Sequence, residues 1–446
     1  MHKFIANTEQ DRQDMLKVIG APSIESLFFD IPENLRFTGE LNLEHGYSEI
    51  EMMDQLQQLA CLNKSIDQLV CFRGAGAYDH YIPTTIKHLA GRSEFFTAYT
   101  PYQPEISQGT LQVIFEYQSM LCELTGMDAS NASMYDGPTA AVEAAIMAAA
   151  IKRKKKVVVS KGLNPEARSV MKTYFHFRDF EMVEVELENG KTNPETLRAA
   201  MCPDCAGVII QNPNFLGMVE DMHALGAVAK ETKSVYIAYV DPISLAVLET
   251  PGNYGADIVI GEGQGLGNVI NFGGPYLGFL ATRSEHVRKI PGRIVGQSED
   301  VDGKRAFVLT LQAREQHIRR FKATSNICSN QGLNVLMGSI YMATMGKEGL
   351  KEVAKQCFDK AQYTYDKLIA TGKFKPAFEG RGFFKEFALV SDVPFEKIDQ
   401  YLIDNGFLGG FSLAEDYGIE GGHLFCVTEK RSKAEIDRLC SMLEVM

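Results

Sequence analysis

The feature that most constrains the fold is an alternation of short apolar runs with amphipathic segments between residues 107 and 280. The apolar runs are Val157–Val159, Met182–Val185, Gly207–Ile210, Val235–Ala238, Ile258–Ile260 and Tyr276–Leu280. Amphipathic stretches, notably residues 164–177 and 221–233, separate the first four runs and predict helices. Strands that alternate with helices predict a mostly parallel, doubly wound sheet that is covered on both faces. The core of this chain is therefore expected to be an α/β domain.

The sequence on either side of this region has a different pattern. Before it, Thr8 and Ser48 stand where helix caps are expected, and Ser48 with Glu51 forms a capping box. After residue 330, a long apolar helix is followed by alternating strands and helices, which are typical of a compact α+β unit. A chain of 446 residues is longer than a single hydrophobic core usually stabilises, so more than one domain is expected. We predict a helical N-terminal arm over residues 1–70, a large α/β domain over 71–330 and a small C-terminal α+β domain over 331–446.

Composition and charge exclude several classes of function. The net charge of −12 argues against a nucleic-acid partner, because phosphate binding depends on Lys and Arg. No window approaches eighteen apolar residues, and the first residues lack the apolar core of a secretory signal, so no membrane association is expected. Nine scattered cysteines fit a reducing compartment, which predicts a cytoplasmic protein. The pair Cys202 and Cys205 has no second pair, so no metal site is predicted.

A large parallel-sheet domain with a smaller α+β domain is the layout of the fold-type I enzymes that use pyridoxal phosphate. In that fold an aspartate at a strand end pairs with the pyridine nitrogen, and Asp241 stands at the expected place. The phosphate needs free N–H groups at a helix N-terminus. Here that turn includes Asp136, Pro138 and Thr139. Because Pro138 has no N–H and Asp136 is negatively charged, we expect an anion to be repelled there.

The lysine that would hold this cofactor is also missing. The segment Tyr254–Asn268 occupies the place where such an enzyme carries its Schiff-base lysine, and it contains none, with Gly265 near the expected position. A Schiff base requires a primary amine. The positions Asp136, Thr139, Asp241 and Gly265 are therefore interpreted as a degenerate cofactor site, and no cofactor is expected to be bound covalently to this chain.

Five segments together carry a specific resemblance. They are Phe72–Pro83, Tyr99–Gly109, Asn131–Gly137, Gln211–Gly217 and Ala323–Ser329. In this order they resemble the P-protein family of the glycine cleavage system, the decarboxylating glycine dehydrogenases, and specifically the N-terminal subunit of the split form. The resemblance extends from the first helix to the last.

The resemblance implies an activity that is shared between two chains. In the split form a second, homologous subunit carries the pyridoxal phosphate lysine, and the two assemble as α2β2 with the active site where they meet. Glycine is decarboxylated there, CO2 is released, and the aminomethyl group passes to the lipoyl group of the H-protein. This chain is expected to supply one wall of that site.

Four residues of the segment Tyr99–Gln108 are expected to reach the shared site: Tyr99, Tyr102, Glu105 and Gln108. Two prolines keep this segment extended, so its side chains can cross an interface. Glu105 fits a proton acceptor or an anchor for the glycine amine, and it fits equally well a cap for the following helix.

Further residues are expected to contact substrate or the partner: Tyr78, Asp79, His80, Ser325 and Asn326. Two other functions stay open for the chain. It could be a scaffold that binds a partner without contributing to turnover. It could also be an independent aminotransferase-like enzyme that uses a lysine elsewhere in the sequence.

Overall fold

The computed structural model describes residues 4, 6–271, 274, 276–325 and 327–446. The chain divides into two compact units, Met1–Lys64 and Ser65–Met446. The first unit contains helices α1 (Glu9–Ile19) and α2 (Glu49–Ala60), with short 3-10 helices at Glu25–Phe28 and Glu33–Leu35. Thr8 and Ser48 cap the two helices, each in a capping box with the residue three positions later. The predicted caps are therefore confirmed, while the predicted boundaries at residues 70 and 330 stay predictions.

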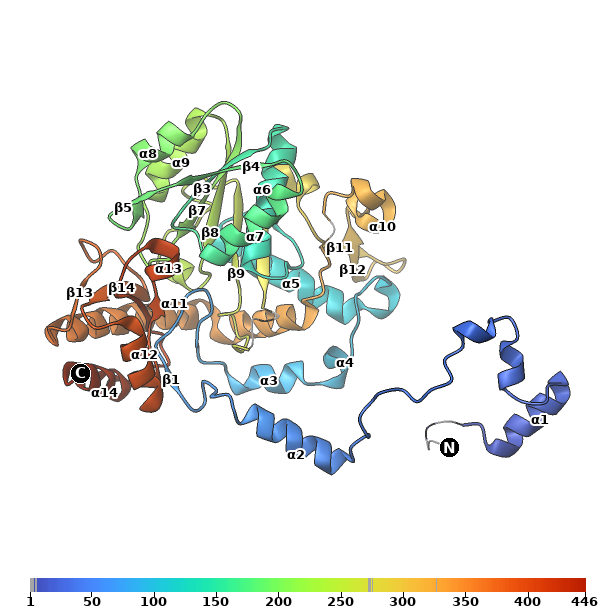
Figure 1. Cartoon of the computed structure of the whole chain (residues 1–446). Helices are drawn as coiled ribbons and strands as arrows, with labels where there is room; N and C mark the ends of the chain where they lie inside the picture. The colour runs from blue at the N-terminus through green and yellow to red at the C-terminus, as the bar shows by residue number, and fades with distance from the viewer. Residues whose placement is uncertain (1–3, 5, 272–273, 275, 326) are drawn as a thin grey trace. The chain divides into compact units, whose positions relative to one another are not determined.

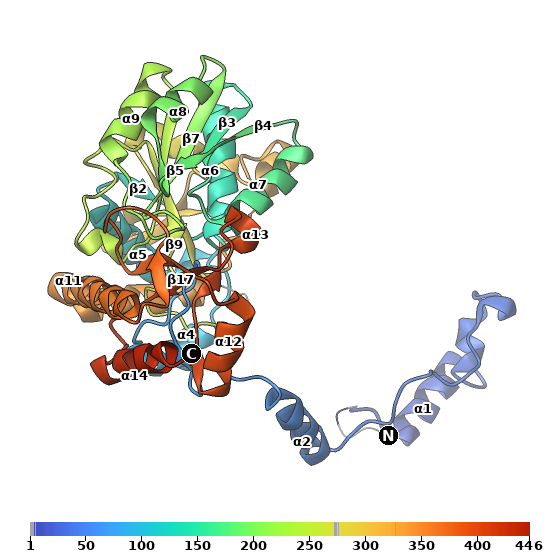
Figure 2. The same cartoon turned by 60° about the vertical axis from the view of Figure 1, so that its left-hand side comes forward.

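The second unit is built on a seven-stranded sheet of order β2-β10-β9-β8-β7-β3-β4 (Figures 1 and 2). Its strands are β2 (Ala129–Ser130), β3 (Lys156–Ser160), β4 (Glu181–Val185), β7 (Cys205–Asn212), β8 (Val235–Val240), β9 (Ile258–Glu262) and β10 (Gly278–Thr282). The five strands from β9 to β4 are parallel, and β10 runs antiparallel to both of its neighbours. The predicted parallel-rich sheet is confirmed.

Helices cover both faces of this sheet. The helices are α5 (Gln108–Thr125), α6 (Gly137–Lys152), α7 (Pro165–His176), α8 (Pro194–Ala200) and α9 (Met222–Glu231). Successive residues of β8 alternate between two cores: Tyr236 and Ala238 belong to the core that contains α5 and α9, while Ile237 and Tyr239 belong to the core that contains α6 and α7. Because both sides of β8 are buried, the strand is apolar throughout.

A second, four-stranded sheet has the order β13-β14-β17-β16. Its strands are β13 (Phe374–Pro376), β14 (Glu386–Ser391), β16 (Phe411–Ser412) and β17 (Gly422–Cys426). Four helices belong to this part of the chain: α11 (Gly332–Ala370), α12 (Phe395–Asp404), α13 (Ala414–Tyr417) and α14 (Lys433–Glu444). The predicted α+β character of the C-terminal residues is confirmed.

The remaining strands and helices of the second unit are short. Strand β1 (Val70–Cys71) pairs in parallel with β15 (Phe407–Leu408), so the start of the second unit lies beside its C-terminal part. Strands β11 (Ile294–Glu299) and β12 (Arg305–Thr310) form a hairpin, and β5 (Leu187–Glu188) pairs with β6 (Lys191–Thr192). The remaining helical segments are α3 (Thr84–Ala90), α4 (Ser93–Phe96), α10 (Gln316–Arg319) and 3-10 turns at Pro104–Ile106, Ser244–Ala246, Ser284–Lys289, Gln312–Arg314 and Arg320–Lys322.

Candidate functional site

A buried ion pair lies at the carboxyl end of β8. Asp241 directly follows this strand, and its Oδ2 atom lies 2.7 Å from Nζ of Lys385, the residue before β14. Both side chains are almost entirely buried. Burial is the largest influence on the pKa of Lys385 and acts to lower it, but the Asp241 carboxylate and other neighbouring groups together outweigh burial, so the pKa lies above its ordinary value. Lys385 is therefore an ammonium ion that faces the carboxylate predicted to pair with a pyridine nitrogen.

His80 continues this network. Its Nε2 atom lies 3.1 Å from Nζ of Lys385, and its Nδ1 atom lies 2.6 Å from Oε2 of Glu429. An ammonium on one side and a carboxylate on the other fit the neutral imidazole that is protonated on Nδ1. Burial acts to raise the pKa of Glu429, but the hydrogen bonds that its carboxylate accepts, from His80 and from the backbone N–H of Tyr81 among others, together outweigh burial and lower the pKa to about 2. His80 thus links a buried cation to a buried anion.

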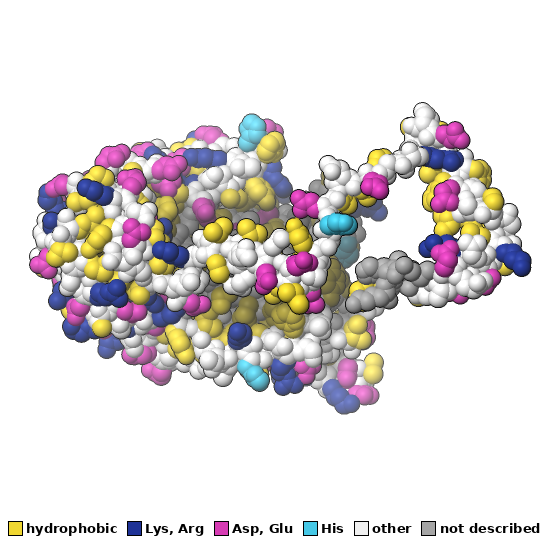
Figure 3. Space-filling view, turned by 60° about the horizontal axis from the view of Figure 1, so that its bottom comes forward, with side chains coloured by type: hydrophobic (Ala, Val, Ile, Leu, Met, Phe, Trp, Pro, Cys, Tyr) yellow, Lys and Arg dark blue, Asp and Glu magenta, His cyan; other side chains and the backbone are white. Residues whose placement is uncertain are grey.

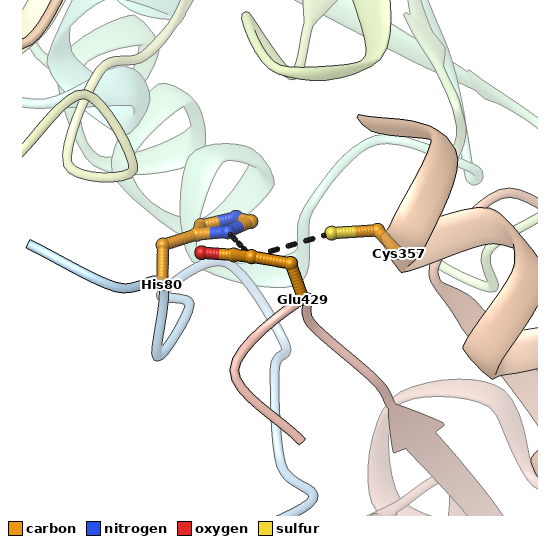
Figure 4. A group of neighbouring side chains, drawn as sticks. All are labelled: His80, Cys357 and Glu429. Carbon is orange, nitrogen blue, oxygen red and sulfur yellow. Dashed lines mark hydrogen bonds and ion pairs between the residues drawn. The ribbon is translucent and has the colours of Figure 1, made fainter. Parts of the chain in front are cut away.

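Cys357 on α11 completes the group drawn in Figure 4, where His80 and Cys357 both contact Glu429. Within the described ranges, the ligand atoms of these three residues are close enough to hold a metal ion, as are those of Asp257, Glu285 and His286. The first group borders the Lys385 ammonium, which disfavours a second cation. In the second group, Asp257 already accepts a hydrogen bond from the backbone N–H of Tyr236. The geometry gives neither group a role as a metal site.

Tyr78 and Asp79 belong to the same buried region. The hydroxyl of Tyr78 donates to Glu386 at 2.8 Å, and its ring centroid lies 3.4 Å from Nζ of Lys385. Asp79 is buried between Lys430 and Arg431, at 2.7 Å and 3.1 Å. The structure thus brings the predicted residues Tyr78 and His80 to the Asp241–Lys385 pair, while the side chain of Asp79 pairs with Lys430 and Arg431. Their polar atoms contact other parts of this same chain, and their expected contacts with substrate or a partner stay predictions.

The N-terminus of α6 is already engaged by carboxyl groups. Asp136 is the N-cap and accepts from the N–H of Thr139 at 2.8 Å. The N–H of Gly137 donates to Oε2 of Glu262 at 2.9 Å, while Oε1 of Glu262 accepts from the N–H groups of Gln264 and Leu277, both at 3.0 Å. Burial raises the pKa of Glu262 to about 7. The expectation that Asp136 repels an anion stays a prediction, and the structure adds a second acidic group, Glu262, at the same N-terminus.

The cofactor implied by the fold does not fit the residues present. Lys385 contacts Asp241, where the pyridine nitrogen would lie. Glu262 accepts from Gly137, where the phosphate would lie. A Cβ atom added to Gly265, where the lysine would begin, would lie 3.1 Å from the ring of His80. Each of the three anchoring positions is thus in contact with a side chain of this protein.

A second polar cavity, of about 130 Å³, collects residues from three distant segments. Arg293, nearly buried, donates to the hydroxyl of Tyr102 at 2.6 Å, and its guanidinium lies 4.8 Å from the centroid of the Tyr102 ring. Glu315 lies 3.6 Å from Nε of Arg293. Ser325 lines the same cavity, so two of the predicted site residues, Tyr102 and Ser325, are brought together.

The other residues of the predicted segment lie apart from this cavity's lining. Tyr99 is 87% exposed and lines a neighbouring hollow with Leu333 and Leu336. Glu105 is exposed in the turn Pro104–Ile106. Gln108 exchanges hydrogen bonds with the backbone of Phe307 and thereby fixes the start of α5 to β12. Asn326 lies outside the described residues.

Several residues of these sites were not selected from the sequence, among them Glu262, Arg293, Lys385 and Glu429. Lys385 had a usable signal, because it stands with Glu386 inside the apolar run Phe383–Val390. A charged pair in such a run indicates partners inside the protein. Glu262 ends a buried strand next to Gly261, and no local pattern shows that it reaches the N-terminus of α6.

Comparison with known structures places the fold in the class of fold-type I pyridoxal phosphate enzymes. The glutamate decarboxylase of Lactobacillus brevis, at 13% identity, superimposes with a TM-score of 0.68 over 93% of this chain and 96% of that one. This low identity supports the fold alone. The predicted fold class is confirmed.

A family model described as glycine cleavage system P-protein matches residues 2–443. The probable glycine dehydrogenase (decarboxylating) subunit 1 of Moorella thermoacetica is 52% identical, over 99% of this chain and 98% of that protein. The crystal structure of a glycine decarboxylase (P-protein) in inhibitor-bound form is 40% identical, with a TM-score of 0.91 and complete coverage of both chains. The chain belongs to the glycine cleavage system P-protein family, which confirms the resemblance seen in the sequence. The described part of the chain contains no helix that is long and apolar enough to span a membrane.

Proposed function

We propose that this chain is the subunit of a two-subunit glycine decarboxylase that does not hold the cofactor. The ion pair between Asp241 and Lys385 carries the proposal, because it engages the carboxylate that a bound pyridine nitrogen would need. Relatives of nearly equal length that are named subunit 1 support the same role.

The partner in this proposal is a homologous subunit that carries pyridoxal phosphate, in an α2β2 assembly. When bound there, the cofactor supplies an electron sink for the carbon that loses CO2. The lipoyl group of the H-protein then receives the aminomethyl group. Glycine, the partner subunit and the lipoylated H-protein are thus the expected ligands and partners.

The cavity beside Tyr102 is the proposed contribution of this chain to the shared site. Tyr102 is about half exposed and Tyr99 is largely exposed, so both rings are accessible to another chain. Arg293 orients the Tyr102 hydroxyl through a hydrogen bond and stacks on its ring. Glu105 is exposed and is the candidate for holding the glycine amine, whereas Gln108 would act by fixing the segment.

The unit Met1–Lys64 supports a large partner surface. Many of its large apolar side chains are exposed: Val18, Ile19, Phe28, Phe29, Leu35, Phe37, Leu41, Leu43, Ile50, Met53, Leu56, Leu59 and Leu62. Hydrophobic side chains are visible on the surface of this segment in Figure 3. Exposed apolar surface of this extent marks protein–protein contacts, and we assign it to the cofactor-bearing subunit.

Reconstitution tests the function. The purified chain, the partner subunit and their mixture are assayed for CO2 release from [1-14C]glycine in the presence of lipoylated H-protein. Only the mixture should be active. Borohydride reduction followed by mass spectrometry should locate the cofactor on the partner. Activity of this chain alone, or cofactor fixed to one of its residues, would contradict the proposal.

The two alternatives make different predictions. A pure scaffold would tolerate replacement of Tyr102 in the reconstituted enzyme. An independent aminotransferase-like enzyme needs a neutral lysine beside the cofactor, and Lys385 is the buried lysine in this pocket. Its ion pair with Asp241 and its raised pKa keep Lys385 protonated and therefore a poor nucleophile.

A further inference from the structure

We propose that Lys385, His80 and Glu262 are built-in replacements for the cofactor, so that the pocket at the carboxyl ends of β8 and β9 excludes pyridoxal phosphate even without a covalent bond. The inference rests on the proposed function for the identity of the cofactor. It extends that function, because a missing lysine alone would still allow the cofactor to bind through its ring and phosphate.

At the end of the pocket where a pyridinium would bind, a cation of this chain already occupies its place. A pyridinium N–H would donate to Asp241, and here the ammonium of Lys385 lies 2.7 Å from that carboxylate. The same ammonium lies over the ring of Tyr78, with 3.4 Å to its centroid. The carboxylate and the ring both interact favourably with a buried cation. To bind, a cofactor ring would have to displace this ion pair. The pair forms within one chain and costs no entropy of association, whereas binding of the cofactor does.

At the other end of the pocket, which we call the anionic end because the phosphate would bind there, a carboxyl group of this chain already occupies its place. Three backbone N–H groups, from Gly137, Gln264 and Leu277, converge on the carboxyl group of Glu262. One of them is at the N-terminus of α6, where such groups ordinarily favour an anion. The side chain of Tyr239 also crowds this point, since a Cβ atom added to Gly137 would lie 2.1 Å from its hydroxyl oxygen.

The place of the anchoring lysine is filled by an imidazole. His80 packs against Gly265 and is held by Glu429 at 2.6 Å and by Lys385 at 3.1 Å. The free space left in the pocket, beside Tyr78, Asp241 and Glu262, is about 20 Å³. Such a space accommodates roughly one water molecule and no aromatic ring. The side chains therefore replace both the charges and the volume of the cofactor.

Binding of pyridoxine 5′-phosphate to the isolated chain tests this inference. This compound has the pyridine nitrogen and the phosphate but an alcohol in place of the aldehyde, so it cannot react with surface lysines. Calorimetric titration of the wild-type chain to about 1 mM should show no saturable binding. Saturable binding to the wild-type chain would overturn the inference, and this measurement requires no variant.

The double variant Lys385→Ala/Glu262→Ala should acquire a site. It leaves the Asp241 carboxylate without its counter-ion and three N–H groups without an acceptor, so pyridoxine 5′-phosphate should bind with a dissociation constant of about 100 µM or lower. The double variant Lys375→Ala/Asp392→Ala removes an exposed ion pair and should bind no ligand. A Lys385→Ala/Glu262→Ala protein that is folded by circular dichroism and still fails to bind would overturn the inference.

The two single variants separate the two ends of the pocket. Glu262→Ala should gain affinity for inorganic phosphate, whereas Lys385→Ala should not. Phosphate binding of equal strength by both variants would contradict the assignment of Glu262 to the anionic end. Failure of these tests leaves the reconstitution result unchanged, because the shared site is assayed with the partner present.

Discussion

Nζ of Lys385 lies 2.7 Å from Oδ2 of Asp241, and this contact joins the two largest sheets of the second unit. Asp241 follows the central strand β8 of the large sheet, and Lys385 precedes β14 of the small sheet. Since both side chains are buried, each charge depends on the other for compensation. The pair therefore holds the end of β8 next to the start of β14, and it does so inside the cofactor pocket.

Lys385→Met should destabilise the protein strongly. The substitution removes the cation and leaves the Asp241 carboxylate buried without its partner, which should lower the free energy of unfolding by about 3–5 kcal/mol. Urea denaturation followed by circular dichroism measures the change. The control is Lys375→Met, which removes an exposed ion pair with Asp392 and should change stability by less than about 1 kcal/mol.

Adding Asp241→Leu to Lys385→Met should restore at least about half of the lost stability, because both buried charges are then absent. Equal stability of Lys385→Met and its surface control would show that the pair is not energetically coupled.

Glu386 should make stability depend on pH. Burial raises its pKa to about 7 from the ordinary value of 4.5, although the N–H of Ala75 and the charge of Lys385 oppose the shift. Between these two values the folded chain binds more protons here than the unfolded chain. The stabilisation from Glu386 is thus complete below the lower value and is lost as the pH rises through about 7.

Glu386→Gln should remove this contribution. The difference in unfolding free energy between the wild type and the variant should change by up to about 1.4 kcal/mol per pH unit between about pH 5 and pH 7. Urea denaturation at a series of pH values gives this difference. The comparison is needed because burial also raises the pKa of Glu143 and Glu262 to about 7. Parallel curves for the two proteins would refute the assignment to Glu386.

Tyr102→Phe should lower the activity of the reconstituted enzyme. The change removes the hydroxyl that accepts from Arg293 at 2.6 Å, and hydrogen bonds to charged groups contribute about 1.5–3 kcal/mol. We expect kcat/KM for glycine to fall about tenfold or more, with a stability loss near 1 kcal/mol. Tyr401→Phe on α12 is the control. Unchanged kinetics of Tyr102→Phe would favour the scaffold alternative.

Gly217→Ala should be far more harmful than Gly372→Ala. Both glycines have positive φ, of 85° and 71°. A Cβ atom at Gly217 would lie 2.0 Å from the carbonyl oxygen of Glu386, whereas nothing lies within 4 Å of one at Gly372. Gly372→Ala should cost about 1–2 kcal/mol from its backbone conformation alone. Gly217→Ala should cost more than about 3 kcal/mol, measured by thermal and urea unfolding. Similar losses for both variants would contradict the close approach.

The sequence predicted the elements better than the contacts between them. The caps at Thr8 and Ser48 depend on neighbouring residues, so they could be inferred locally. The apolar runs predicted the large sheet because a strand buried on both faces has few polar residues. Asp241 was selected because it stands at the end of the strand that the run Val235–Ala238 predicts, where this fold places an aspartate.

The polar contacts of the site depend on chain topology instead. Lys385 reaches Asp241 and Glu429 reaches His80 only because β14 and the residues after β17 return to the large sheet. No periodicity encodes which of several acidic residues will meet a given lysine. The same reason explains why Tyr102 was selected while Arg293, its partner across 191 positions, was not.

The pairing of β1 with β15 has a consequence for biosynthesis. Nearby, the guanidinium of Arg73 donates to the carbonyl of Gly410, 337 positions later in the chain. Ribosomes add on the order of 10 residues per second, so roughly half a minute passes between the synthesis of Val70 and that of its partner Phe407. During translation this stretch is an unprotected edge, and a nascent chain stalled before Phe407 would be a natural client for chaperones.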